Sequence, residues 1–189
     1  MPLSRLGLFG GTFDPPHNGH VAALRAAAQS GRFDVIEVTV AGEPYRKTSV
    51  AGIHAANVRL AMAIVAFGHL DLVRVSSREI SRPGPSYTIE TVKELFEENQ
   101  QVDVLIGADL APQLSTWHHA EELRQLVSVG IIPRPGTTAM TPAGWGCYEI
   151  AMAPVDLSST FLRDNVLQRE ELLKFMPEEV IAIFQSARD

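Results

Sequence analysis

The chain has 189 residues, of which 46% are hydrophobic and 20% are charged, and its formal net charge is -6. These values exclude an intrinsically disordered chain and are typical of one globular domain that buries a core. A sequence pI of about 5.5 argues against a general affinity for nucleic acid or for an anionic membrane. Any phosphate must therefore be bound at a local site.

Cysteine content and hydropathy restrict the protein further. Cys147 is the single cysteine, which excludes an internal disulfide and a CxxC metal or redox motif. The first eleven residues reach a double glycine too early for the apolar region of a signal peptide. The most apolar helical stretch, residues 58–73, contains Arg59, His69 and Asp71 and is too short for a membrane span. We therefore expect a cytoplasmic protein with neither a nucleic-acid nor a membrane partner.

Short apolar strands alternate with amphipathic helices along most of the chain. We predict strands at 6–9, 35–40, 70–76, 102–107 and 127–133, and helices at 20–30, 55–67, 88–98 and 120–126. Ser86 or Thr88 is the expected cap of the third helix. Strands separated by helices form βαβ units, so this order predicts an α/β fold with a doubly wound, mostly parallel sheet covered on both faces.

The last third of the chain is less regular. Residues 134–148 contain three glycines and two prolines, which predicts an irregular surface excursion. A short strand near 148–153 follows, then a helix that opens at 158–166, and a final helix with Pro177 in its first position. No linker or repeat divides the sequence. We expect one domain over 1–189, in which 157–189 form a small C-terminal helical part.

The stretch GGTFDPPHNGH, residues 10–20, lies where the first strand meets the first helix. In an open α/β sheet, ligands gather at the carboxyl ends of the strands, where the N–H groups of a helix start favour anions. Gly10 and Gly11 allow the backbone to approach a bound group, and Thr12 adds a hydroxyl. His17 and His20 can both turn toward the same pocket. A double glycine alone indicates only a turn, but this order of residues predicts a triphosphate site.

This stretch resembles the signature of the HxGH nucleotidyltransferase superfamily, and in particular of the bacterial nicotinate mononucleotide adenylyltransferases. Further segments are similar to that family in the same order and extend the resemblance over nearly the whole chain. They are GEPYRK at 42–47, PSYTIETVKEL at 85–95, LIGADL at 105–110, STWHHAEEL at 115–123, PRPG at 133–136 and LSSTFLR at 157–163. The resemblance implies a Rossmann-like nucleotidyltransferase fold.

The resemblance also implies adenylyl transfer. In that reaction the 5′-phosphate of nicotinate mononucleotide attacks the α-phosphorus of ATP, giving nicotinate adenine dinucleotide and pyrophosphate in NAD biosynthesis. The second pKa of a phosphate monoester is about 6, so the nucleophile is already ionised at neutral pH. Such an enzyme needs no serine or cysteine nucleophile. It acts by aligning two anions and neutralising charge as pyrophosphate leaves.

By similarity, the ATP site is built from both ends of the chain. His17 and His20 would contact the phosphates, with His20 stabilising the transition state, and the backbone of 11–13 would approach the α-phosphate. Residues 158–163 would clamp the β- and γ-phosphates. The carboxylate of Asp109 would accept from the ribose hydroxyls. The full set is Gly10, Gly11, Thr12, Phe13, His17, His20, Gly107, Asp109, Ser158, Ser159, Thr160 and Arg163, and the expected catalytic residues are His17, His20, Lys47 and Arg163.

The mononucleotide half of the site is assigned by similarity to Lys47, Thr88 and Trp117. Lys47 would contact the mononucleotide phosphate or the reacting region. N–H groups at the start of the Thr88 helix would bind the nicotinate carboxylate, and the Trp117 indole would stack on the ring. A plain N-cap for Thr88 and a core aromatic for Trp117 stay open as alternatives. Tyr45 departs from the family, in which His or Trp is common after this proline.

No metal site made by the protein is expected. His118 and Glu122 have a spacing that suits a metal, but without a third ligand a solvated helix face is the better interpretation. Mg²⁺ would arrive with ATP, held mainly by phosphate oxygens. The expected partners are the small molecules ATP and nicotinate mononucleotide, and a homo-oligomer is compatible with the sequence.

Two alternative functions remain at this point. The nearest is an adenylyltransferase that acts on nicotinamide mononucleotide or phosphopantetheine, because the preference for acid or amide depends on how N–H groups meet one carboxylate. The other is a nucleotide-binding regulator without turnover, although His17, His20 and Arg163 are all present. A fragment of an aminoacyl-tRNA synthetase is excluded by the length and acidity of the chain.

Overall fold

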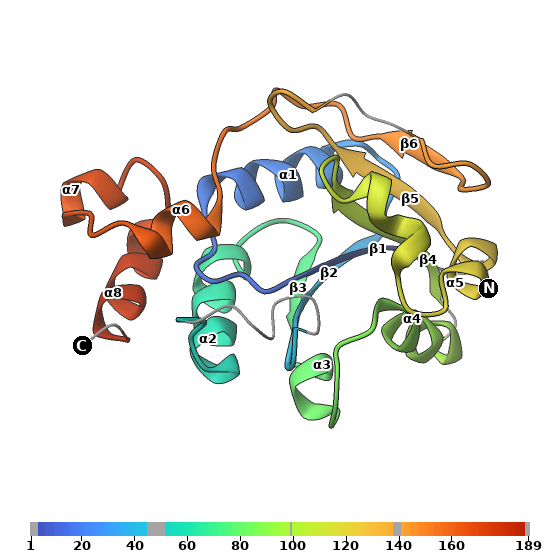
Figure 1. Cartoon of the computed structure of the whole chain (residues 1–189), viewed down its shortest axis with the longest axis horizontal. Helices are drawn as coiled ribbons and strands as arrows, with labels where there is room; N and C mark the ends of the chain where they lie inside the picture. The colour runs from blue at the N-terminus through green and yellow to red at the C-terminus, as the bar shows by residue number, and fades with distance from the viewer. Residues whose placement is uncertain (1–3, 45–51, 99, 138–140, 188–189) are drawn as a thin grey trace.

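The computed structural model describes residues 4–44, 52–98, 100–137 and 141–187, and it shows an α/β fold (Figure 1). A six-stranded sheet has the order β3-β2-β1-β4-β5-β6, and every neighbouring pair of strands is parallel. The strands are β1 (Ser4–Gly11), β2 (Val35–Val40), β3 (Val73–Ser76), β4 (Gln100–Gly107), β5 (Ser128–Ile132) and β6 (Cys147–Glu149). This is the order of the doubly wound dinucleotide-binding fold, so the predicted fold class is confirmed.

Helices connect the strands and cover both faces of the sheet. They are α1 (Asn18–Gln29), α2 (Ala56–Phe67), α3 (Arg78–Ser81), α4 (Thr88–Glu97), the 3₁₀ helix η1 (Ala111–Thr116), α5 (Ala120–Leu126), α6 (Ser159–Asp164), α7 (Arg169–Leu172) and α8 (Glu178–Ser186). Within the described ranges, no helix has the length and apolar character that crossing a membrane requires.

The two faces of the sheet contribute to two hydrophobic cores, because successive side chains of a strand point to opposite faces. In β1, Leu6 and Leu8 belong to the core with α4 and α5, whereas Phe9 belongs to the core with α1 and α2. The same alternation separates Val104 from Leu105 in β4. The sheet is therefore buried on both sides, as a parallel sheet requires.

The C-terminal helices return to the side of the sheet that α1 and α2 cover. Val180, Ile181 and Phe184 of α8 share a core with Met62 and Phe67 of α2. Figure 1 shows α6, α7 and α8 in orange and red beside α2. The predicted C-terminal helical part is thus present and packs on a helix from the first half of the chain.

Several predicted boundaries were wrong. The N-cap of α4 is Tyr87, so neither Ser86 nor Thr88 caps this helix, and Pro177 is the N-cap of α8 instead of its first residue. The strand predicted from residue 70 begins at Val73, because the chain turns before it and Leu72 has a φ of 61°. Helices α3, η1 and α7 have only four to six residues, too few for a periodic signal.

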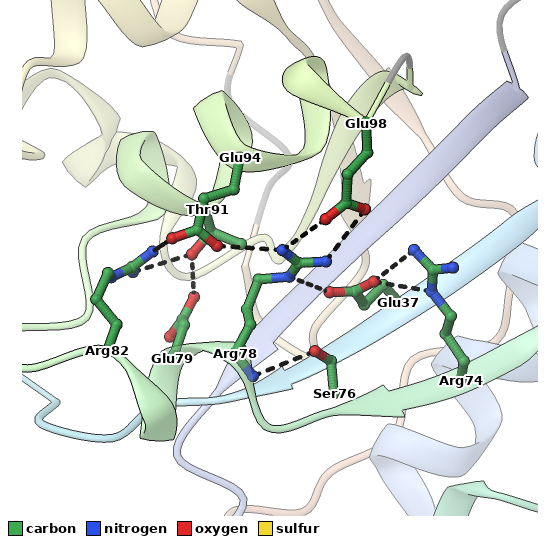
Figure 2. A network of polar contacts seen from close by, with 9 residues as sticks. All are labelled: Glu37, Arg74, Ser76, Arg78, Glu79, Arg82, Thr91, Glu94 and Glu98. Carbon is green, nitrogen blue, oxygen red and sulfur yellow. Dashed lines mark hydrogen bonds and ion pairs between the residues drawn. The ribbon is translucent and has the colours of Figure 1, made fainter.

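A buried carboxylate joins β2 and β3 to α3 and α4 (Figure 2). Glu37 of β2 is 1% exposed and pairs with Arg74 of β3 and Arg78 of α3, each at 2.7 Å. Arg78 also reaches Glu94 and Glu98 of the α4 segment, each at 3.1 Å. Burial acts to lower the pKa of Arg78, but hydrogen bonds to these three carboxylates outweigh it and raise that pKa. The network attaches α3 and α4 to the sheet.

Arg78→Ala should lower the free energy of unfolding by about 3 kcal/mol, because it removes a partner of a buried carboxylate. Urea unfolding at neutral pH measures the change. Arg124→Ala is the matched control, since its pair with Glu121 lies on the surface, and its loss should cost at most about 0.5 kcal/mol. Equal losses in the two variants would contradict the stabilising role of the Glu37 network.

Candidate active site

A cleft of about 560 Å³ opens at the carboxyl ends of β1 and β4. Between these strands the chain order of the sheet reverses its direction, and open α/β sheets bind ligands at this point. The lining combines residues from the first, middle and last parts of the chain: Gly10, Gly11, Thr12, Phe13, His17, His20, Thr88, Gly107, Asp109, Trp117, Arg134, Ser158, Ser159 and Thr160.

The β1–α1 loop, residues 12–17, is shaped by the packing of Phe13. This residue has a φ of 48°, and its ring contacts the rings of His20 and Phe67 at centroid distances of 5.1 and 5.4 Å. A β-carbon at Gly11 would lie 2.8 Å from the Phe13 ring. Only glycine therefore fits beside this ring without a shift of the loop. Phe13 in turn supports the ring of His20.

The two histidines of the motif stack on each other at the start of α1. Their ring centroids are 3.7 Å apart, and the backbone N–H of His17 donates to Nδ1 of His20 at 3.2 Å. With Nδ1 as an acceptor, a neutral His20 ring carries its proton on Nε2 and presents a donor. A β-carbon at Gly19 would lie 3.0 Å from Nδ1 of His17. The glycine between the histidines thus leaves room for the stacked rings.

His17 is held in its neutral form. The residue is 1% exposed, and burial, with a smaller effect of the Arg134 charge, lowers its pKa to about 3. Its buried Nδ1 makes no hydrogen bond within the described part of the chain. His17 therefore acts on its neighbour through packing and through its backbone N–H, without a charge of its own at neutral pH.

Asp109 and Arg134 lie together on the wall that follows β4 and β5. A β-carbon at Gly107 would lie 2.5 Å from Oδ1 of Asp109, so the glycine gives this carboxylate its place at the strand end. Nε of Arg134 is 3.6 Å from the same oxygen, and Nη1 donates to the carbonyl of Leu157 at 2.8 Å. No role is predicted for Arg134 from the sequence, although its place directly after the fifth strand is a signal for a cleft residue.

Two serines at the start of α6 have different roles. Ser158 caps α6 by accepting a hydrogen bond from the Phe161 N–H at 3.1 Å. Ser159 donates from its hydroxyl to the carbonyl of Pro15 in the β1–α1 loop at 2.9 Å. This long-range bond joins segments 144 residues apart and places Ser158, Ser159 and Thr160 in the cleft lining.

Arg163 is the one residue of the predicted ATP site that does not line the cleft. Its contact with a phosphate stays a prediction. Its guanidinium donates to the carbonyl of Asp14 at 2.6 Å and to Oγ1 of Thr160 at 3.2 Å. Because α6 docks on the β1–α1 loop through this guanidinium, Arg163 is turned toward the loop backbone. It anchors the helix whose first residues line the cleft.

Two of the three residues predicted for the mononucleotide line the cleft. Thr88 is the first residue of α4, Trp117 directly follows η1, and both line the cleft. The Trp117 indole also packs against the core with α4 and α5, and its buried Nε1 makes no hydrogen bond to any described residue. Trp117 therefore both lines the cleft and packs against the core. Lys47 and Tyr45 lie outside the described residues.

His118 and Glu122, whose spacing in the sequence suits a metal, each contact a different neighbour. The His118 ring stacks on Tyr87 at 3.9 Å, and Glu122 pairs with Lys93 at 2.9 Å. In the ranges that the structure describes, no three His, Cys, Asp or Glu side chains gather as a metal site would require.

Comparison with known proteins decides the family. The model of the cytidylyltransferase-like family matches residues 8–178. A probable nicotinate-nucleotide adenylyltransferase of Methylibium petroleiphilum is 36% identical over 188 residues, with 95% of this chain and 87% of the relative covered. The chain belongs to the cytidylyltransferase-like family and, within it, to the nicotinate-nucleotide adenylyltransferases.

Other members of this family support the assignment. A probable nicotinate-nucleotide adenylyltransferase of Exiguobacterium sibiricum is 33% identical, with 93% of each chain covered. The fold agrees with that of the Plasmodium falciparum nicotinic acid mononucleotide adenylyltransferase complexed with NaAD, with a TM-score of 0.78 at 16% identity. That alignment covers 97% of this chain and 95% of the other and shows the shared fold.

For an enzyme of this family, the structure brings nearly the whole predicted ATP site together. Every residue of that predicted set lines the cleft except Arg163. The contacts of these residues with ATP remain predictions. His54 and Arg59 hold the β1–α1 loop through Asp14 and Thr12, and neither they nor Asp14 are among the predicted site residues.

His17→Gln should make stability less dependent on pH. The pKa of about 3 in the folded chain lies below the ordinary 6.5, so the unfolded chain binds a proton that the folded chain does not. The contribution of neutral His17 to the free energy of unfolding is fully present above about pH 6.5. It decreases as the pH falls, by about 2 kcal/mol between pH 7 and pH 5. Glutamine carries no such proton.

Urea unfolding at these two pH values measures the effect. The loss of stability on acidification should be smaller in His17→Gln than in the wild type by that amount. His69→Gln, at an exposed position outside the cleft lining, controls for the loss of an imidazole. The same pH slope in His17→Gln and in the wild type would contradict the neutral buried state of His17.

Proposed function

We propose that the cleft transfers the adenylyl group of ATP to nicotinate mononucleotide, giving nicotinate adenine dinucleotide and pyrophosphate. The observation that carries this proposal is the convergence of the stacked His17–His20 pair, Asp109 and Trp117 on one cleft at the reversal point of the sheet. Membership of the family supports the same reaction.

The reaction needs alignment more than activation. An oxygen of the mononucleotide 5′-phosphate forms a bond to the α-phosphorus, the bond from that phosphorus to the bridging oxygen breaks, and its electron pair leaves with pyrophosphate. The attacking phosphate has a second pKa of about 6, so it needs no general base at neutral pH. His20 donates from Nε2 to an oxygen that gains negative charge. Its ring is already held by Phe13 and His17, so this donor is preorganised.

ATP is positioned by groups on three sides of the cleft. Backbone N–H groups of 11–13 approach the α-phosphate, the Asp109 carboxylate accepts from the ribose hydroxyls, and the first-turn N–H groups of Ser159 and Thr160 meet the β- and γ-phosphates. Arg134 adds a cation beside Asp109, and Arg163 acts indirectly by anchoring α6. The place of these residues in or behind the cleft lining supports the assignment.

Mg²⁺ is proposed to enter with ATP and to neutralise charge on the leaving pyrophosphate. A Mg²⁺ ion bound mainly by phosphate oxygens needs few ligands from the protein.

Nicotinate mononucleotide occupies the other half of the cleft. The Trp117 indole stacks on the pyridine ring, N–H groups at the start of α4 bind the nicotinate carboxylate, and Lys47 contacts the phosphate. The position of Thr88 and Trp117 in the same cleft lining as His20 supports this arrangement. Lys47 is assigned on the family motif alone.

Three broader proposals accompany the reaction. Residues 1–189 form one domain in which 157–189 complete the ATP site, supported by the packing of α8 on α2 and by the hydrogen bond from Ser159 to Pro15. A cytoplasmic location is proposed from the composition and the single cysteine. A homo-oligomer remains compatible with the sequence.

Pyrophosphate release should be fastest with nicotinate mononucleotide when it, nicotinamide mononucleotide and phosphopantetheine are supplied separately with Mg·ATP. The reason is that N–H groups at a helix start favour a carboxylate over a neutral amide. The measured quantity is kcat/KM for each acceptor. Equal kcat/KM values for the nicotinate and nicotinamide mononucleotides would contradict the substrate assignment but not adenylyl transfer. The absence of pyrophosphate release with all three acceptors would contradict adenylyl transfer itself.

His20→Ala should lower kcat about 100-fold or more, the typical loss when one preorganised donor to a transition state is removed. Steady-state kinetics at saturating substrates measure it. His69→Ala is the control, because His69 is exposed and outside the cleft lining, and it should keep the wild-type kcat. An unchanged kcat in His20→Ala excludes the proposed role.

A further inference from the structure

Arg59 binds three separate segments around the cleft without lining it. The residue lies in the first turns of α2 and is 2% exposed. Its Nη1 donates to the carbonyl of Thr12 at 3.0 Å, its Nη2 to the carbonyl of Gly42 at 3.1 Å, and its Nε to the carbonyl of His54 at 3.0 Å. One buried cation thus holds backbone from three places in the sequence.

Two of these carbonyls belong to opposite halves of the cleft. Thr12 is part of the β1–α1 loop on the ATP side. Gly42 donates its N–H to Oγ of Ser86 at 2.9 Å, and Ser86 N–H donates to the carbonyl of Glu43 at 3.0 Å. Ser86 lies two residues before the first residue of α4 and lines the cleft together with Thr88, on the side proposed for the mononucleotide. The Arg59 guanidinium therefore links the ATP side to the mononucleotide side. It bonds to the carbonyls of Thr12 and Gly42, and the segment of Gly42 is in turn bonded to Ser86.

The Gly42 end of this link packs closely against α3. A β-carbon at Gly42 would overlap the carbonyl oxygen of Glu79 in α3, so the two backbones are in direct contact. Glu79 is buried, accepts a hydrogen bond from Thr91 of α4 at 2.8 Å, and lines the cleft. Figure 2 shows Glu79 and Thr91 within the polar network that ties α3 to α4. The segment that Arg59 holds is thus supported from the opposite side as well.

The third carbonyl leads back to the β1–α1 loop. The His54 N–H donates to Oδ2 of Asp14 at 3.0 Å, and Nδ1 of His54 lies 2.6 Å from Oδ1. Burial lowers the pKa of Arg59, and the fully buried Asp14 carboxylate opposes this shift. The Arg59 cation and the Asp14 carboxylate of the β1–α1 loop therefore stabilise each other.

We propose that Arg59 is a positioning residue for adenylyl transfer, which keeps the ATP half and the mononucleotide half of the cleft at the separation that attack on the α-phosphorus requires. The inference rests on the proposed function. A guanidinium is needed because its rigid planar fork reaches three fixed carbonyls at once, whereas a lysine ammonium is a point charge on a flexible stem. Without the fork, each half keeps its own binding groups but the reacting atoms are misaligned.

Arg59→Lys should lower kcat about 100-fold, since a misplacement of about 1 Å can cost that much. The Kd of ATP and the Kd of nicotinate mononucleotide, each measured alone by calorimetry, should stay within about 3-fold of the wild type, because neither half-site loses a ligand contact. Arg74→Lys is the control. It makes the same substitution in β3, at a half-exposed arginine that pairs with the buried Glu37 and does not line the cleft, and it should keep the wild-type kcat.

Ser86→Ala tests the same link from its other end. It removes the Gly42–Ser86 bond without emptying the guanidinium site, and it should lower kcat about 10-fold with both Kd values retained. Thermal unfolding shows whether each variant is folded at the assay temperature. If Arg59→Lys does not fold, Ser86→Ala decides the question.

Two kinds of result would overturn the inference. One is a wild-type kcat in the folded variants. The other is a loss of kcat matched by an equal loss of affinity for both substrates, which is the sign of general disruption. A wild type that transfers no adenylyl group to any acceptor would remove the proposed function, and this inference with it. An active wild type with unaffected variants would remove this inference alone.

Discussion

The carbonyl groups of Thr12, Asp14 and Pro15 are where the separate parts of the molecule meet. They accept hydrogen bonds from Arg59 of α2, from Arg163 of α6 and from Ser159 at the start of α6, respectively. The loop that carries them crosses the reversal point of the sheet, where β1 ends beside β4. Buried or half-buried backbone carbonyls need partners, and in this loop the partners come from elements far away in the sequence. Satisfying the loop backbone therefore also assembles the cleft.

The charges around the cleft are organised by the same packing. Burial keeps His17 neutral, which lets it stack closely on His20 without repulsion between two imidazolium rings. Two arginines near the cleft are fixed by partners of their own: Arg134 by Asp109 and the Leu157 carbonyl, and Arg163 by the loop backbone. A polyphosphate entering this cleft would meet donors whose positions are already set, which is the condition for electrostatic catalysis without reorganisation.

Much of the fold follows from local patterns in the sequence. The strand at 35–40 and the helices at 56–67 and 120–126 lie where alternation of apolar runs and amphipathic periods predicts them. The failures lie at boundaries and in short helices. Tyr87 holds the N-cap position of α4 without a side-chain capping bond, while the Ser86 hydroxyl accepts from the distant Gly42 N–H. The strand β3 is shortened by the turn at Leu72, whose positive φ no apolar pattern indicates. Helices of one turn, such as α3, are formed by tertiary ion pairs and leave no period to detect.

The sequence by itself determined the parallel sheet, the cleft position at the end of the first strand and the residue types that a triphosphate site needs, because these depend on spacing within short segments. Only the tertiary structure decided which arginine does what. Arg134 lines the cleft, Arg163 turns to the Asp14 carbonyl, and Arg59 is buried behind the loop. A guanidinium binds whichever carbonyl or carboxylate the fold brings within its reach. Those acceptors lie up to 149 residues away in the chain, beyond the range of any local pattern.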